Sequence, residues 1–289
     1  MFAITAITGK VGGAVARTLL DAGRQVRAVV RDAAKGAPWA ALGCEVAIAD
    51  LSDAAPLAAA FAGTEGVFVL LPPVFDPAPG FPDATAHIAV IREALVRAAP
   101  PRVVVLSTIG ADSDRPNLLN ALRLLEQALA DLPMPITFLR AAWFMENAAW
   151  DVASAREQGV IHSYLQPLDR PVPMIATDDV GSTAAALLRE DWTGHRIVEL
   201  EAIERVTPNA IAAAFADALG KPVEAQIVPR ADWEGIFRDQ GMQNPLPRMQ
   251  MVDGFNAGWI DFRDGGAQAR KGRIAIGAVV AALVGKDSA

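Results

Sequence analysis

Residues 3–20, AITAITGKVGGAVARTLL, decide the fold expected for this chain. They begin with a strand-like apolar run, pass through the glycine-containing turn Thr8–Gly12, and continue with apolar residues at helical spacing. Such a turn directs backbone N–H groups and the positive end of the helix toward a pyrophosphate. Gly9 would let the backbone approach the phosphates, and Gly12 would let the helix pack against the strand. Ala6 replaces the first glycine of the usual pattern, which predicts a slightly wider turn or a displaced ligand; a turn without a ligand is the alternative.

Short apolar strands and longer amphipathic helices alternate from this point to about residue 150. The strands are almost wholly apolar, which is typical of a sheet covered by helices on both faces. The pattern therefore predicts an α/β fold with a doubly wound parallel sheet. We expect strands at Phe2–Ile7, Gln25–Val30, Glu45–Ile48, Gly66–Leu71, Arg102–Leu106 and Pro135–Leu139, and helices at Gly12–Ala22, Ala54–Phe61, Asp83–Ala98 and Pro116–Ala130.

The regular alternation stops beyond about residue 150. The remaining segments predict a smaller lobe over the strand ends, where ligands of open α/β sheets bind. The apolar stretch Ile274–Val284 is shorter than the ~20 residues of a membrane span and predicts a packed helix. Further elements are expected at Asp178–Arg189, Arg196–Leu200, Pro208–Leu219, Val223–Val228 and Ala231–Gln240.

The composition excludes several classes of protein. With 289 residues, 52% of them hydrophobic, the chain is long and apolar enough to fold around a core. A net charge of -7 argues against direct nucleic-acid binding. The single cysteine, Cys44, excludes an internal disulfide, and the scattered His87, His162 and His195 predict no metal site. The N-terminus does not resemble a signal peptide, so a cytoplasmic protein is expected.

The second strand ends in VVRDAAK, residues 29–35. Arg31, assisted by Lys35, is suited to clamp the 2′-phosphate of NADP(H), whereas Asp32 could instead bind the ribose of NAD(H). This arrangement favours NADP(H) over NAD(H), although an ordinary solvated Arg–Asp pair would look the same.

Other strands also end in residues suited to ligand contact, because the carboxyl ends of parallel strands meet at one edge. Asp50 could bind the adenine amino group and is followed by Leu51. Leu71 and Pro72 could cover the ribose, and Ser107 could lie beside the nicotinamide. The proline-rich loop Pro72–Pro82 starts at this edge and is expected to face the ligand.

Taken in order, these motifs resemble the NmrA-like branch of the atypical short-chain dehydrogenases. The resemblance rests on TGKVG, VFVLLPP, VVVLSTIGA and especially ITFLRAAWFMENA, and it continues through MIATDDVGSTAAALL and IAAAFADALGKPVEAQIVPRADWEGIF. It implies a Rossmann NAD(P)-binding domain over residues 1–150 and a smaller C-terminal α+β substrate lobe over residues 151–289. The NADP(H)-binding residues expected from motifs and resemblance together are Thr8, Gly9, Lys10, Val11, Gly12, Arg31, Lys35, Asp50, Leu51, Leu71, Pro72 and Ser107.

The chain lacks the Tyr-x-x-x-Lys pair with which short-chain dehydrogenases act on alcohols. Its single tyrosine, Tyr164, has no lysine four residues on, and the helix expected at Pro116–Ala130 offers only Arg123 as a basic residue. Arginine stays protonated and is a poor acid or base. No catalytic residue is therefore assigned, with Tyr164 and Arg123 as the candidates.

Hydride transfer to a quinone-like or azo acceptor does not need that pair, because the reduced anion can take its proton from water. Resemblance and chemistry together favour an NADPH-dependent reductase with an apolar substrate pocket. The alternative is a non-catalytic NADP(H)-binding redox sensor of the NmrA type. We expect a small-molecule acceptor and no membrane association; a homodimer or a regulatory protein partner stays open. The expected pocket walls are Phe75, Ile109, Trp143, Phe144 and Tyr164.

Overall fold

The computed structural model describes residues 1–286, which form two compact units. Unit 1 comprises residues 1–112, 119–140 and 177–198, and unit 2 comprises residues 113–118, 141–176 and the chain from 199 onward. The chain passes between the units several times, whereas the sequence predicts one crossing near residue 150. Each unit is described separately below.

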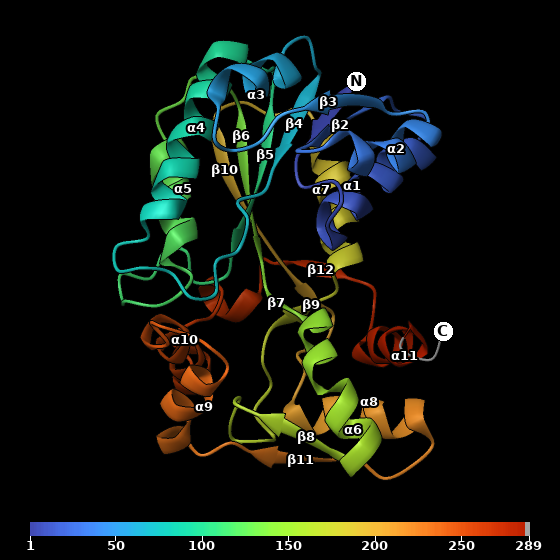
Figure 1. Ribbon diagram of the computed structural model, residues 1–289, viewed down its shortest axis with the longest axis vertical. Coiled ribbons are helices and arrows are strands. Elements are labelled where there is room, and N and C mark those ends of the chain that lie inside the picture. Colours follow the sequence, from blue (N-terminus) through green and yellow to red (C-terminus); the bar gives the residue numbers. More distant parts are fainter. Residues whose placement is uncertain (287–289) are drawn as a thin grey trace. The chain divides into compact units, whose positions relative to one another are not determined.

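An eight-stranded sheet with the order β12-β10-β6-β5-β4-β1-β2-β3 organises the fold (Figure 1). The pairs β1–β2, β1–β4, β2–β3, β4–β5 and β10–β12 are parallel. The α/β class and the doubly wound parallel sheet are thus confirmed. The strands are β1 (Phe2–Ile4), β2 (Val26–Val30), β3 (Glu45–Ile48), β4 (Gly66–Val69), β5 (Val103–Thr108), β6 (Ile136–Ala141), β10 (His195–Ala202) and β12 (Arg270–Gly272).

Helices cover both faces of the sheet in unit 1, which is why its central strands are buried along their whole length. One layer consists of α3 (Ala54–Phe61), α4 (Pro82–Ala98) and α5 (Asn120–Leu129), and the other contains α1 (Lys10–Asp21) and α7 (Thr177–Arg189) (Figure 1). In the second layer, a Cβ on Gly181 would lie 2.3 Å from the Cβ of Ala14, so α7 needs a glycine to pack this closely on α1.

Three expectations about unit 1 are wrong. The strand predicted at Arg196–Leu200 is β10, which joins the main sheet beside β6 instead of the smaller lobe, so the sheet has more strands than the six predicted. The helix α2 (Ala33–Ala41) was not predicted, because Gly36 and Pro38 lower its helical propensity. The first strand ends at Ile4 instead of Ile7, because the chain turns at Ala6.

Unit 2 is built from small sheets and short helices. Strands β8 (Val160–Ser163) and β11 (Glu224–Ile227) pair in parallel, as do β7 (Trp143–Phe144) and β9 (Met174–Ile175). A separate apolar core lies between α6 (Val152–Gln158), α8 (Pro208–Leu219) and α11 (Ile276–Lys286). The remaining α-helices among the described residues of this unit are α9 (Trp233–Asp239) and α10 (Leu246–Ala257), of which α10 was not predicted.

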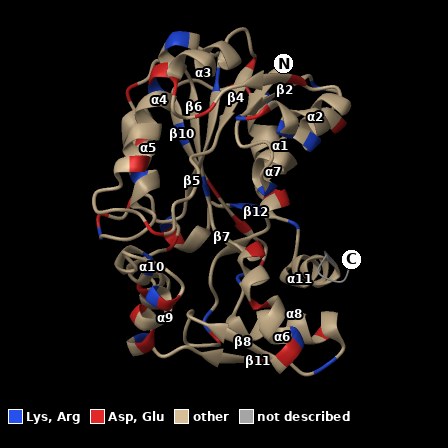
Figure 2. Ribbon diagram, viewed as in Figure 1, with Lys and Arg blue, Asp and Glu red and all other residues tan. Residues whose placement is uncertain are grey.

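In Figure 2, acidic and basic residues are interspersed over several helices. Among the described residues, no helix combines the length and the apolar character that a membrane span requires.

Candidate functional site

The turn between β1 and α1 presents an open helix N-terminus. Gly9 is the N-cap residue, with an extended backbone and no side chain to bind the first N–H groups. The first turn of α1 also contains no acidic side chain. Because these N–H groups carry partial positive charge, the turn is suited to an anionic group such as a phosphate.

Gly12 determines how closely this turn packs against the helix. A Cβ at Gly12 would lie 2.3 Å from the carbonyl oxygen of Ala6 and 2.9 Å from that of Thr5. Ala6 has φ 49°, in the left-handed region that glycine adopts without strain. The chain therefore makes the tight turn with an alanine in place of the first glycine, and the residues fit a dinucleotide.

Thr5 was not predicted as a site residue, yet it holds the turn in place. Its hydroxyl donates to the carbonyl oxygen of Phe68 at 3.1 Å and accepts the N–H of Leu70 at 3.0 Å. These bonds tie the end of β1 to the end of β4 and thereby bring Thr8–Gly12 to the same sheet edge as Leu71 and Pro72. Leu71 is buried and Pro72 is exposed.

Arg31 follows β2 with its side chain exposed. Within the described residues, its guanidinium forms no hydrogen bond or ion pair, and the exposed Lys35 lies in the first turn of α2. Asp32 is instead the N-cap of α2 and accepts the N–H of Ala34 at 2.7 Å. Because the cap occupies one carboxylate oxygen of Asp32, the local geometry favours Arg31 as the ligand-binding residue.

Asp50 is held by its own turn after β3. Its carboxylate accepts the backbone N–H of Ser52 at 2.7 Å and also the Ser52 hydroxyl. The Ser52 side-chain and backbone bonds lower the pKa of Asp50, and nearby Arg31 lowers it further. Asp50 is therefore a charged acceptor near Arg31, and Leu51 beside it is half-buried.

Ser107, near the end of β5, belongs to a buried polar network that was not predicted. Its hydroxyl donates to Glu126 of α5 at 2.5 Å, and Arg140 of β6 binds the same carboxylate through Nε at 3.0 Å and Nη2 at 2.7 Å. Arg140 also pairs with Asp112 at 3.0 Å. Burial acts to lower the pKa of Arg140, but these carboxylates outweigh burial and raise it. Because the Ser107 proton is committed to Glu126 and the residue is only 2% exposed, Ser107 presents little surface to a ligand.

A sequence signal for this network existed. Arg140 directly follows the apolar strand predicted at Pro135–Leu139, and a charge that such a strand buries requires a partner. The partner, Glu126, is not identifiable from spacing alone.

The predicted pocket walls of unit 1 differ in accessibility. Phe75 is 48% exposed in the loop between β4 and α4, whereas Ile109 is 1% exposed and presents almost no surface to a ligand. Arg123 on α5 donates to the carbonyl oxygen of Asp112 at 3.0 Å.

The predicted walls of unit 2 belong to two aromatic groups. Trp143 packs edge-on against Phe255 with ring centroids 5.1 Å apart, and Phe144 next to it is half-buried. Tyr164 stacks on Phe237 at 5.1 Å and contacts Trp233 edge-on. Burial raises the pKa of Tyr164, which makes it a weaker proton donor than an ordinary tyrosine.

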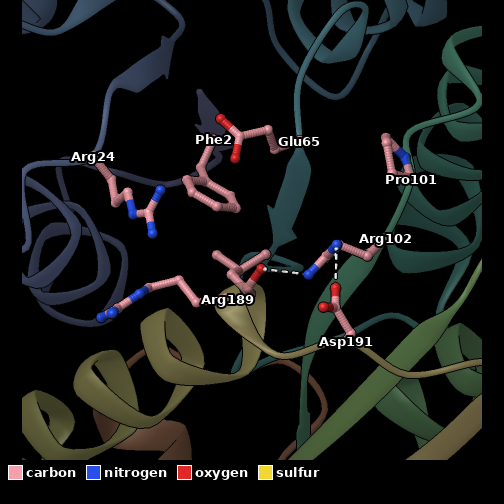
Figure 3. Close-up of a pocket in the computed structure, with 8 residues that line it drawn as sticks. Phe2, Arg24, Glu65, Pro101, Arg102, Arg189 and Asp191 are labelled. Carbon is pink, nitrogen blue, oxygen red and sulfur yellow. Dashed lines mark hydrogen bonds and ion pairs between the residues drawn. The ribbon is translucent and has the colours of Figure 1, made fainter.

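A pocket of about 260 Å³ lies at the opposite, amino-terminal edge of the sheet in unit 1 (Figure 3). Its residues Phe2, Glu65 and Arg102 stand at or just before the starts of β1, β4 and β5. Arg102 is already paired with Asp191 at 2.8 Å. Ligands of open α/β sheets bind at the carboxyl ends of the strands, so this pocket is separate from the candidate site.

Fold and turn together define a Rossmann-like α/β protein whose first turn is suited to a dinucleotide. The sequence matches the NmrA-like family over residues 2–262, and the chain belongs to that family. The predicted resemblance is thereby confirmed.

Characterised relatives are similar over most of the chain. An NAD(P)H azoreductase of Xenophilus azovorans is 29% identical over 248 residues, which cover 85% of this chain and 83% of the relative. Quinone oxidoreductase 2 of Escherichia coli is 29% identical over 251 residues, covering 86% and 85%.

Solved structures share the fold. The NADPH complex of an NADPH-dependent quinone oxidoreductase from Escherichia coli superposes with a TM-score of 0.81 at 24% identity, covering 98% of this chain and 99% of that one. The NADP(H) complex of a triphenylmethane reductase from Citrobacter also has a TM-score of 0.81, at 20% identity and the same coverage.

Proposed function

We propose that this protein is an NADP(H)-dependent reductase that transfers hydride to a quinone-like or azo acceptor. The observation that carries the proposal is the uncapped turn Thr8–Gly12, followed after β2 by Arg31, which has no partner among residues 1–286, in a member of the NmrA-like family. The relatives named as an azoreductase and a quinone oxidoreductase support the same class of acceptor.

The chain's own residues would each bind one part of the cofactor. The first N–H groups of α1 bind the pyrophosphate, Arg31 and Lys35 bind the 2′-phosphate, and Asp50 accepts from the adenine amino group. Leu71 and Pro72 cover the ribose, and the nicotinamide half lies beside Ser107 at the end of β5. When bound, NADPH supplies the hydride, so the protein's contribution is binding and orientation.

The absence of a Tyr-x-x-x-Lys pair from the sequence suits this class of acceptor. Hydride addition to a quinone yields a hydroquinone anion that takes a proton from water, whereas ketone reduction needs a positioned acid. An azo bond requires two successive hydride transfers, with two NADPH molecules consumed for each pair of amines released.

The test is NADPH consumption by the purified protein, followed by absorbance, with simple quinones and azo dyes as acceptors. We expect acceptor-dependent turnover that is faster with NADPH than with NADH, with one NADPH used per quinone and two per azo bond. The Arg31→Ala variant is the matched control and should lose the NADPH preference. Tight NADP(H) binding without turnover of any acceptor would overturn the reductase and favour the redox sensor.

A further inference from the structure

Arg248 of α10 differs in its hydrogen-bond partner from the other arginines that are shielded from solvent. Nine other arginine side chains are buried or half-buried, and each donates to at least one oxygen of the protein. Within the described residues, the hydrogen bond of the half-buried Arg248 goes to the Sδ atom of Met242 at 3.7 Å, and no carboxylate pairs with it. A thioether sulfur is a weak acceptor, so the guanidinium keeps most of its donors unused.

Aromatic rings surround this guanidinium. Its central carbon lies 4.4 Å from the ring centroid of Phe237 and 5.3 Å from that of Trp150. Phe237 in turn stacks on Tyr164 at 5.1 Å. Trp150 is 60% exposed, so this cluster of Trp150, Tyr164, Phe237 and Arg248 reaches the surface.

The charges around the cluster do not neutralise Arg248. Burial lowers its pKa, and the Tyr164 hydroxyl opposes that effect only in part. The Tyr164 hydroxyl is hydrogen-bonded to Gln240, and the charge of Asp151 helps to raise the pKa of Tyr164. Burial raises the pKa of Asp151 itself to about 6. A desolvated cation without a counter-ion is unfavourable, and a ligand anion would remove that cost.

We propose that this cluster is a binding site for an aromatic anion, with Arg248 binding a carboxylate or sulfonate group and the exposed Trp150 ring stacking on the ligand's ring. A guanidinium matches the two oxygens of such a group with two parallel hydrogen bonds, and a ring beside the anion adds stacking. If the protein is the proposed reductase, the site selects acceptors that carry an acidic substituent, an inference that rests on that proposed function.

The first experiment measures binding alone, by calorimetry, and needs no turnover. The probes are 2-naphthalenesulfonate and its neutral analogue 2-naphthalenemethanol. We expect the wild-type chain to bind the sulfonate at least about tenfold more tightly than the alcohol, which corresponds to one charged hydrogen-bonded pair. Equal affinities for the two probes would overturn the proposal.

Variants connect the preference to Arg248. Arg248→Met keeps the approximate length of the side chain. It should abolish the preference for the sulfonate and leave the affinity for the alcohol within about twofold. Arg248→Lys keeps the charge and provides a second test if Arg248→Met does not fold. Arg230→Met is the matched control, because Arg230 also stacks on a ring, Trp233 at 4.8 Å, but is neutralised by Asp253 at 2.8 Å. An unchanged preference in Arg248→Met, or an equal loss in Arg230→Met, would contradict the assignment.

A second experiment asks whether the site serves the reaction. It compares KM for 1,4-naphthoquinone-2-sulfonate and for 1,4-naphthoquinone in the presence of NADPH. We expect Arg248→Met to raise KM for the sulfonate about tenfold with little change in kcat, and to leave the neutral quinone unaffected. Selective binding of the sulfonate without this effect on KM would overturn the link to the acceptor and leave the anion site standing. If wild type turned over neither quinone, that result would count against the proposed reductase activity itself.

Discussion

The carbonyl oxygen of Ala6 lies 2.3 Å from the position that a Cβ would take on Gly12. Ala6 and Gly12 therefore act together. The left-handed Ala6, at φ 49°, makes the turn and directs its carbonyl oxygen at the start of α1, where Gly12 leaves room for it. The same carbonyl accepts the N–H of Gly9 at 2.9 Å, so it cannot move away without opening the turn.

Gly12→Ala tests this packing. The added methyl group meets backbone atoms, so the turn must shift; we expect a loss of about 1–3 kcal/mol in the free energy of unfolding. NADPH affinity should fall more than about tenfold, because the first N–H groups of α1 shift with the turn. Urea unfolding and calorimetry measure the two effects. Gly235→Ala, where a Cβ has no neighbour within 4 Å, is the control and should change neither the free energy of unfolding nor the NADPH affinity. Unchanged NADPH affinity in Gly12→Ala would exclude the turn from the binding site.

Arg31→Ala tests the preference for the 2′-phosphate. Because Arg31 forms no hydrogen bond or ion pair in the described part of the chain, its removal should leave the free energy of unfolding unchanged within about 0.5 kcal/mol. NADPH affinity should fall about 10- to 100-fold, as expected for lost hydrogen bonds to a charged group, and NADH affinity should stay the same. Arg24→Ala, at another exposed arginine, is the control. Equal losses for both nucleotides would refute the role.

Glu126→Ala tests the buried network. Arg140 is only 5% exposed and would keep just the half-exposed Asp112, so we expect a loss of about 3 kcal/mol in the free energy of unfolding. The double variant Glu126→Leu/Arg140→Met should be more stable than Glu126→Ala, because it leaves no buried cation. Chemical denaturation of both variants measures this difference in the free energy of unfolding. Single and double variants of equal stability would show that Arg140 is solvated.

Asp151 predicts a pH dependence of stability. Burial raises its folded pKa from 3.8 to about 6, against the opposing effects of the His162 N–H and side chain. Between about pH 4 and pH 6 the folded chain therefore holds a proton that the unfolded chain has released, and Asp151's contribution to stability falls as pH rises through this range, by up to about 3 kcal/mol.

Asp151→Asn should remove this component, so the stability difference between variant and wild type grows in favour of the variant from pH 4 to pH 6. Urea unfolding across that range measures it. Asp217→Asn, at an exposed aspartate of α8, should leave the pH profile as it is. A wild-type and an Asp151→Asn profile that run parallel would contradict the raised pKa.

The sheet and the turn could be predicted because both are encoded by neighbours in the chain. Apolar runs between helices predicted the central strands, and Thr8–Gly12 followed from a strand, two glycines and a helix in direct succession. The loop after β4 was also predictable from its prolines. Local helical propensity did not predict α2, because Gly36 and Pro38 lower it; tertiary packing stabilises this helix.

Which distant side chains meet could not be predicted and became visible in the folded chain. The fold places β10 beside β6 in the main sheet, joins both Ser107 and Arg140 to Glu126, and stacks Arg248 on Trp150, almost 100 residues earlier in the chain. Such contacts have no period or spacing in the sequence. They form because burying the strands and helices forces each enclosed charge to find a partner or an aromatic ring, and the geometry of the fold determines which one lies within reach.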